Sequence, residues 1–134
     1  LIASGVWEDT AENRARLTCP GPRAVPVPEG VSYGDLAHLT GADSAYAARE
    51  TKAFPLAKFP SGGVELEPLV ACDNARGPNH AGSMNVLYSD GSVVVLVFAQ
   101  EIERGILPAG ASTIAVGKDS PVEDLRKLGE AEEK

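Results

Sequence analysis

Residues 72–96 of this chain read CDNARGPNHAGSMNVLYSDGSVVVL, and no other stretch is as specific about the fold. The stretch starts as a polar, glycine-bearing loop that carries His80. It continues into two runs of β-branched and aromatic residues on either side of Asp90-Gly91. An Asp-Gly pair between two such runs is the strongest short-range signal for a tight antiparallel hairpin, because glycine tolerates the positive φ that a primed turn requires. The stretch therefore predicts a hairpin at the centre of the fold.

The spacing around this hairpin forms a recognisable motif. Nine residues separate His80 from Asp90, and Gly91 follows directly. This pattern resembles the C-terminal signature of prepilin-type proteins that carry the processing-associated H-X9-DG domain. The resemblance covers residues 17–96 in scattered blocks, of which the last is the specific one. The other blocks are Cys19-Pro20, Ser32-Tyr33-Gly34, Pro68-Leu69, Asn79-His80 and Asn85-Val86-Leu87-Tyr88.

The resemblance implies both a fold and a role. The fold is α+β, a pilin-like globular head with a small antiparallel β-sheet, the Asp-Gly hairpin at its centre and a long apolar N-terminal helix packed beside it. The role is that of a pilin-like or pseudopilin-like structural subunit in a type II secretion or type IV pilus filament. Such a subunit acts by assembly with other pilin or pseudopilin subunits. It lies in the periplasm or at the cell surface, and the N-terminal helix of its precursor anchors it in the inner membrane.

The start of the chain departs from the family pattern. Family members begin with a short leader, a prepilin-peptidase cleavage site and a long apolar helix, whereas this chain begins LIASGVWEDT. That segment is too short and too polar to span a bilayer, which requires about 20 apolar residues. We therefore expect an ectodomain without its anchor helix. The alternative is a small extracellular module that binds a carbohydrate or a protein.

Composition and charge restrict the classes of function. The length of 134 residues suits one domain over residues 1–134, with a charged tail at 130–134 that we expect to fray. The formal net charge of -7 argues against nucleic acid as a partner. Affinity for a phosphate backbone comes from clustered Lys and Arg, and this chain has an acidic excess instead.

Four further segments carry secondary-structure signals. Residues 31–33 suit a short strand, and residues 64–71 alternate apolar and acidic side chains as a strand with one wet face does. The alanine-rich residues 41–52 predict a short helix. Residues 120–129 begin with a Ser-Pro step and a glutamate at capping-box spacing, which predicts a short C-terminal helix that ends near the glycine at its close.

The two cysteines, Cys19 and Cys72, are far apart in the sequence. Neither has a cysteine or histidine partner at zinc-finger spacing. Because the resemblance implies a location outside the cytoplasm, it implies a disulfide between them. That bond would stabilise the fold by about 4 kcal/mol in the chain-entropy account. The alternative is a pair of unbonded, buried thiols.

A nucleophilic site built from Cys72, His80 and Asp90 is one chemical interpretation of the motif. Cysteine catalysis requires the thiol and the imidazole within hydrogen-bond reach, and the short loop between them allows this. A straight strand between His80 and Asp90 would however hold the acid on the order of 30 Å away. We therefore expect no catalytic residues, with His80, Asp90 and Gly91 shaping the loop and the turn.

Calcium is the one metal that the sequence suggests. Asp73, Asn74 and Asp90 offer oxygen atoms of the kind that Ca²⁺ prefers, within one loop-rich segment. Their spacing is not that of a known calcium loop. The alternative is that these residues form turns by bonding their own backbone, and in that case the protein needs no cofactor.

Overall fold

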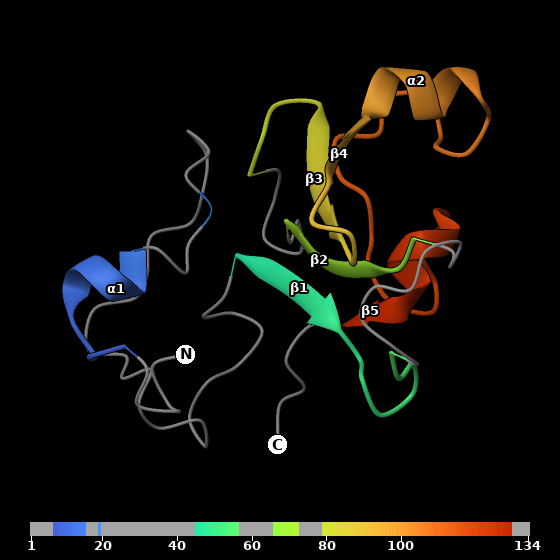
Figure 1. Cartoon of the computed structure of the whole chain (residues 1–134). Coiled ribbons are helices and arrows are strands. Elements are labelled where there is room, and N and C mark those ends of the chain that lie inside the picture. The colour runs from blue at the N-terminus through green and yellow to red at the C-terminus, as the bar shows by residue number, and fades with distance from the viewer. Residues whose placement is uncertain (1–6, 16–18, 20–44, 57–65, 73–78, 130–134) are drawn as a thin grey trace.

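The computed structural model describes residues 7–15, 19, 45–56, 66–72 and 79–129 (Figure 1). Over these residues the chain forms five strands and three short helices. In chain order they are α1 (Ala11–Ala15), β1 (Tyr46–Arg49), β2 (Pro68–Cys72), β3 (Ser83–Tyr88), β4 (Val93–Val97), α2 (Phe98–Glu103), the 3-10 helix η2 (Glu123–Lys127) and β5 (Leu128–Gly129).

The strands form one antiparallel sheet in the order β4-β3-β2-β1-β5. The prediction of a small antiparallel sheet with few helices is therefore confirmed. β3 lies second from one edge and makes the longest ladder of the sheet with β4. Neighbouring strands in the chain are neighbours in the sheet, except that β5 returns from the C-terminal end to pair with β1. No helix in the described part of the chain is long and apolar enough to cross a membrane.

The predicted hairpin is present, but β3 and β4 form one edge of the sheet and not its centre. Its turn also differs from the primed type. The N–H of Gly91 donates to the carbonyl of Tyr88 at 3.0 Å, and the N–H of Tyr88 donates to the carbonyl of Ser92 at 2.9 Å. Gly91 has a φ of 86°, while every non-glycine residue that the structure describes has a negative φ. A two-residue primed turn would need positive φ at Asp90 as well. The loop is instead a turn followed by a glycine bulge, and the Asp90 carboxylate accepts the N–H of Ser92 at 2.8 Å.

The two faces of the sheet differ in what covers them. On the core face Ala47, Ala71 and Val86 are paired across three strands and are almost fully buried. The chain from α2 to β5 returns along this face (Figure 1). It supplies further buried side chains, namely Phe98, Leu107, Ile114, Leu125 and Leu128.

We call the opposite side the outer face, and it carries Tyr46, Val70, Leu87, Val93 and Val95. Alternation along the strands and the cross-strand register place these residues together. Val93 is 60% exposed and Val95 is 52% exposed, whereas the others are half-buried. The outer face is therefore mainly apolar, and it is open along β4.

The predicted helix over residues 41–52 is wrong where the structure describes it. Residues 46–49 form β1, whose Ala47 is fully buried against β2. Alanine has high helix propensity, but here its small side chain lets the strand lie between β2 and β5, and tertiary pairing overrides the propensity. Residues 41–44 lie outside the described residues.

The predicted C-terminal helix is also wrong in its type and length. Residues 123–127 form only a 3-10 turn, and residues 128–129 form β5. The residue that caps this turn is Val122, not Ser120, whose hydroxyl accepts the N–H of Val122 at 3.2 Å. The backbone of Leu128 pairs with Arg49, and this pairing ends the helical segment. The strand expected at 31–33 and the tail at 130–134 lie outside the described residues.

Candidate functional site

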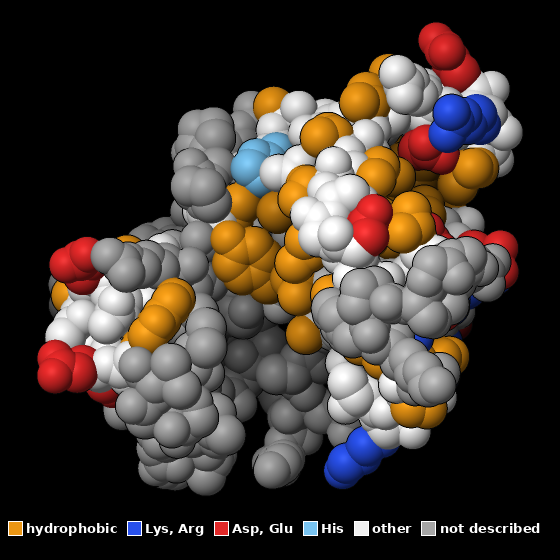
Figure 2. Space-filling view, in the orientation of Figure 1, with side chains coloured by type: hydrophobic (Ala, Val, Ile, Leu, Met, Phe, Trp, Pro, Cys, Tyr) orange, Lys and Arg blue, Asp and Glu red, His pale blue; other side chains and the backbone are white. Residues whose placement is uncertain are grey.

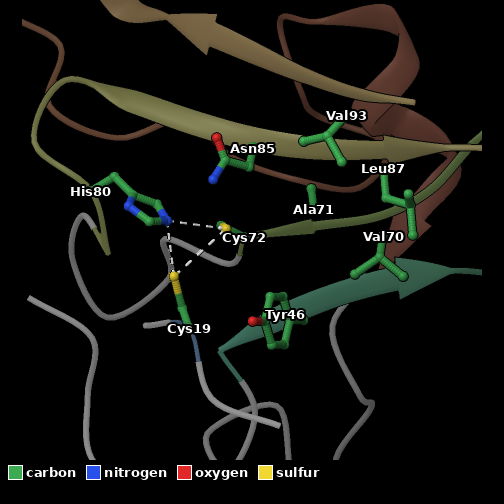
Figure 3. Close-up of a pocket in the computed structure, with 9 residues that line it drawn as sticks. All are labelled: Cys19, Tyr46, Val70, Ala71, Cys72, His80, Asn85, Leu87 and Val93. Atoms are coloured by element: carbon green, nitrogen blue, oxygen red, sulfur yellow. Dashed lines mark hydrogen bonds between the residues drawn. The ribbon is translucent and has the colours of Figure 1, made fainter. Parts of the chain in front are cut away.

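Three side chains from distant parts of the sequence meet at one end of the outer face. Cys19 Sγ lies 3.8 Å from Cys72 Sγ and 2.9 Å from His80 Nε2. Cys72 Sγ lies 3.5 Å from the same nitrogen. The imidazole nitrogen thus points at two sulfur atoms at once, as Figure 3 shows. We call these three residues the Cys2His cluster.

The local structure explains how the cluster forms. Cys72 is the last residue of β2 and pairs with Tyr46 of β1. His80 forms an isolated bridge with Ser83 just before β3, and this tight step is possible because Gly82 has a φ of 71°. β2 and β3 are neighbours in the sheet, so the end of one and the approach to the other lie side by side.

Asn79 fixes the approach to His80. Its side chain is buried, and its amide nitrogen donates to the carbonyl of Ala45 at 3.2 Å. Ala45 directly precedes β1, so this hydrogen bond joins the segment before β3 to the start of β1, two strands away in the sheet. A buried amide with a backbone partner holds its segment in place. The orientation of the imidazole is therefore set by secondary structure and by its sequence neighbour.

Burial governs the charge of the cluster. Cys19 and Cys72 are both almost fully buried, and His80 is half-buried. Burial raises the pKa of Cys72 to about 11, and the nearby Cys19 adds to the increase, although a hydrogen bond with the Asn85 backbone offsets part of it. With its pKa raised in this way, the Cys72 thiol is mostly protonated at neutral pH and is a poor nucleophile.

A pocket of about 390 Å³ opens from the cluster along the outer face. Figure 2 shows apolar side chains gathered beside the histidine, over the region where Figure 1 draws β1 to β3. Tyr46 stands on the pocket wall, and burial raises its pKa, with further contributions from Cys19 and Cys72. The residues that line the pocket are Cys19, Tyr46, Val70, Ala71, Cys72, His80, Asn85, Leu87 and Val93 (Figure 3).

The structure brings together two of the three residues of the candidate nucleophilic site. Cys72 and His80 are in contact, but Asp90 lies in the turn at the far end of β3. Hydrogen bonds with Ser92 lower the pKa of Asp90, and its carboxylate faces solvent. Among the described residues no carboxylate hydrogen-bonds to His80. The acid that would orient the imidazole for catalysis is thus not supplied by Asp90.

The structure tests neither the predicted calcium site nor the predicted disulfide. Asp73 and Asn74 lie outside the described residues, so calcium binding with Asp90 stays a prediction. Cys19 and Cys72 are free thiols in this structure. Their sulfurs are nevertheless adjacent, as a disulfide between them requires, and that pairing also stays a prediction.

The Cys2His cluster was not predicted as a unit from the sequence. Each of the three residues was a candidate site residue from the sequence, but Cys19 is separated from the other two by most of the N-terminal half of the chain. The signal that could have indicated the cluster was the short spacing between Cys72, at the end of one strand, and His80, just before the start of the next. No family model, curated protein or solved structure matches this chain.

Proposed function

We propose that this chain is the globular head of a pilin-like or pseudopilin-like subunit that acts by assembly into a type II secretion or type IV pilus filament. Its partners are other subunits of the same filament. In the precursor an apolar N-terminal helix anchors the head to the inner membrane, and the head lies in the periplasm or at the cell surface.

The observation that carries this proposal is the apolar outer face. A sheet with one packed face and one open apolar face has a surface left to cover, and contiguous exposed apolar patches mark interaction sites. Val93 and Val95 project from the edge strand β4 of this face. We assign the outer face as the surface against which an apolar helix or a neighbouring subunit packs.

The positions of the motif residues support a structural role for the motif. His80 shapes the entry to β3, while Asp90 and Gly91 shape its exit. The motif thus fixes both ends of one strand, and the strand carries residues of both faces. A motif that specifies a scaffold in this way suits a subunit that works by assembly.

The test uses the native gene and its assembled product. We expect the codons upstream of Leu1 to encode a prepilin-peptidase cleavage site and an apolar helix. In the full-length protein, Val95→Asp on the outer face should abolish incorporation into filaments. Ala99→Asp, an exposed position on α2, should leave incorporation unchanged. Equal incorporation of both variants would contradict the assignment of the outer face.

A second candidate is an extracellular module that binds a small carbohydrate or a protein segment. The pocket of about 390 Å³ on the outer face favours it, because ligand sites are concave and mostly apolar with a few polar groups. A plain secretory signal upstream of Leu1, with no apolar helix after it, would favour this second function over the first.

A further inference from the structure

We propose that Cys19, Cys72 and His80 bind one Zn²⁺ ion. The inference rests on the geometry of the Cys2His cluster and does not depend on the filament role. It differs from the calcium site suggested by the sequence in its residues and in its ligand atoms.

The distances between the three ligand atoms match a tetrahedral zinc site. Zinc lies about 2.3 Å from sulfur and about 2.0 Å from nitrogen, so tetrahedral angles place two sulfurs about 3.8 Å apart and a sulfur about 3.5 Å from a nitrogen. The structure has 3.8 Å between Cys19 Sγ and Cys72 Sγ, and 3.5 Å between Cys72 Sγ and His80 Nε2.

The third distance requires a small adjustment. Cys19 Sγ lies 2.9 Å from His80 Nε2, which is shorter than the tetrahedral value by about 0.6 Å. Binding therefore requires these two atoms to separate by this amount. The three ligand atoms already lie within 4.8 Å of one another, so binding needs no rearrangement of the sheet.

The ligand types select the metal. Two thiolates and an imidazole form a soft to borderline set, which suits Zn²⁺ and disfavours Ca²⁺ and Mg²⁺, whose ligands are oxygen atoms. The described residues supply three ligands, and the fourth tetrahedral position is left for water, as in other zinc sites of the Cys2His type.

A disulfide is the competing state of the same two sulfurs. A bond between Cys19 and Cys72 requires the sulfurs to approach by about 1.8 Å from their present separation. It would also leave His80 Nε2 facing a bonded sulfur pair, which is a weak hydrogen-bond partner. In the metal-bound state all three side chains are ligands. In the disulfide state only the two cysteines are bonded, and the imidazole nitrogen has no ligand role.

The experiment titrates the reduced, metal-free protein with Co²⁺ as a spectroscopic probe and then with Zn²⁺. We expect thiolate-to-cobalt charge-transfer absorption that saturates at one equivalent and is removed by Zn²⁺ but not by Ca²⁺. Cys19→Ser and His80→Ala should each weaken binding by more than about tenfold, since even the loss of an outer-shell partner costs that much. Asp90→Asn is the matched control at the other end of β3 and should bind as the wild type does.

Two results would overturn the proposal. One is the absence of cobalt–thiolate absorption in the reduced wild-type protein. This measurement does not depend on the folding of any variant. The other is unchanged affinity in both Cys19→Ser and His80→Ala, with circular dichroism that confirms their folded state. Failure of either kind leaves the assembly function untouched, because that function is tested through Val95 and the upstream codons.

Discussion

His80 Nε2 lies 3.5 Å from Cys72 Sγ, where Cys72 ends β2 and His80 lies just before β3. Cys19 Sγ approaches the same nitrogen at 2.9 Å. This contact is compatible with three uses of the thiols: catalysis, a disulfide and metal ligation. Burial raises the pKa of Cys72, which disfavours the thiolate that catalysis requires, and Asp90 lies in the turn at the far end of β3.

Oxidation should switch the cluster from metal ligation to a disulfide. When the thiols are oxidised with diamide, we expect the loss of Zn²⁺ binding and a mass decrease of about 2 Da, because the metal binds thiolate and not disulfide. Dithiothreitol should restore binding. The measurement is zinc retention after gel filtration of the oxidised and reduced protein. Full retention by the oxidised protein would place the metal elsewhere.

Tyr88 should stabilise the fold most strongly below about pH 10. Its hydroxyl donates to Asp124 Oδ2 at 2.6 Å, and burial, together with this partner, raises the pKa of Tyr88 well above its usual value. A raised pKa means that the protonated form is favoured in the fold, so the contribution is complete below the unfolded pKa of about 10 and is lost as pH rises further.

The variant Tyr88→Phe tests this contribution. It should lower the free energy of unfolding by roughly 1 to 3 kcal/mol at neutral pH, the range for a hydrogen bond to a charged group. The difference from the wild type should shrink above about pH 10. Urea denaturation at several pH values measures both effects, and a difference that grows in alkali would contradict the assignment.

Glu67 should stabilise the fold at neutral pH and lose this contribution in acid, whereas Tyr88 loses its contribution in alkali. Its Oε2 accepts from Lys127 at 2.9 Å and from Arg49 at 2.7 Å, which ties β1, the start of β2 and η2 together. The hydrogen bond from Lys127 is the main cause that lowers the pKa of Glu67, and Arg49 adds to it. A lowered pKa gives a contribution that is present above the unfolded pKa and is lost as pH falls through the folded value.

Glu67→Gln should therefore destabilise the protein by roughly 1 to 2 kcal/mol at neutral pH, at the lower end for charged hydrogen bonds because the site is partly exposed. The difference should disappear in acid. Thermal unfolding from about pH 3 to pH 7 checks this. Glu103→Gln, an exposed position on α2, serves as the control, and an equal effect there would show that the ion pairs of Glu67 add no stability.

Gly91 should tolerate no side chain without strain. Its φ of 86° lies in the left-handed region, while a Cβ added to this residue would meet no atom within 4 Å, so only the backbone conformation opposes substitution. Gly91→Ala should cost about 1 to 2 kcal/mol, and Gly91→Asn should cost less because asparagine adopts this region more readily. Chemical denaturation of both variants gives the comparison, and equal costs would contradict it.

The sequence predicted those parts of the fold that depend on local signals. Asp90-Gly91 indicated the hairpin, because glycine at a bulge is a local requirement. The apolar run of residues 69–71 indicated β2, whereas the alternating residues 66–67 lie before this strand and residues 64–65 lie outside the described residues. The strand identity of residues 46–49 could not be predicted in the same way. Its alanines favour a helix locally, and only pairing with β2 and β5 makes it a strand.

The three residues of the candidate site could be predicted from the sequence, but their proximity to one another could not. Cys72 and His80 stand at a strand end and a strand start, so their proximity follows once β2 and β3 are known to be neighbours. The place of Cys19 depends on the path of the N-terminal segment, for which the sequence carries no periodic signal. A tetrahedral ligand set assembled from such distant positions has no spacing motif to reveal it.

Zinc binding is measured most directly by native mass spectrometry of the reduced protein after incubation with Zn²⁺. We expect one zinc ion per chain, with two protons displaced from the thiols, and a metal-free His80→Ala variant under the same conditions. A wild-type chain that stays metal-free, or that carries zinc equally well without His80, would contradict it.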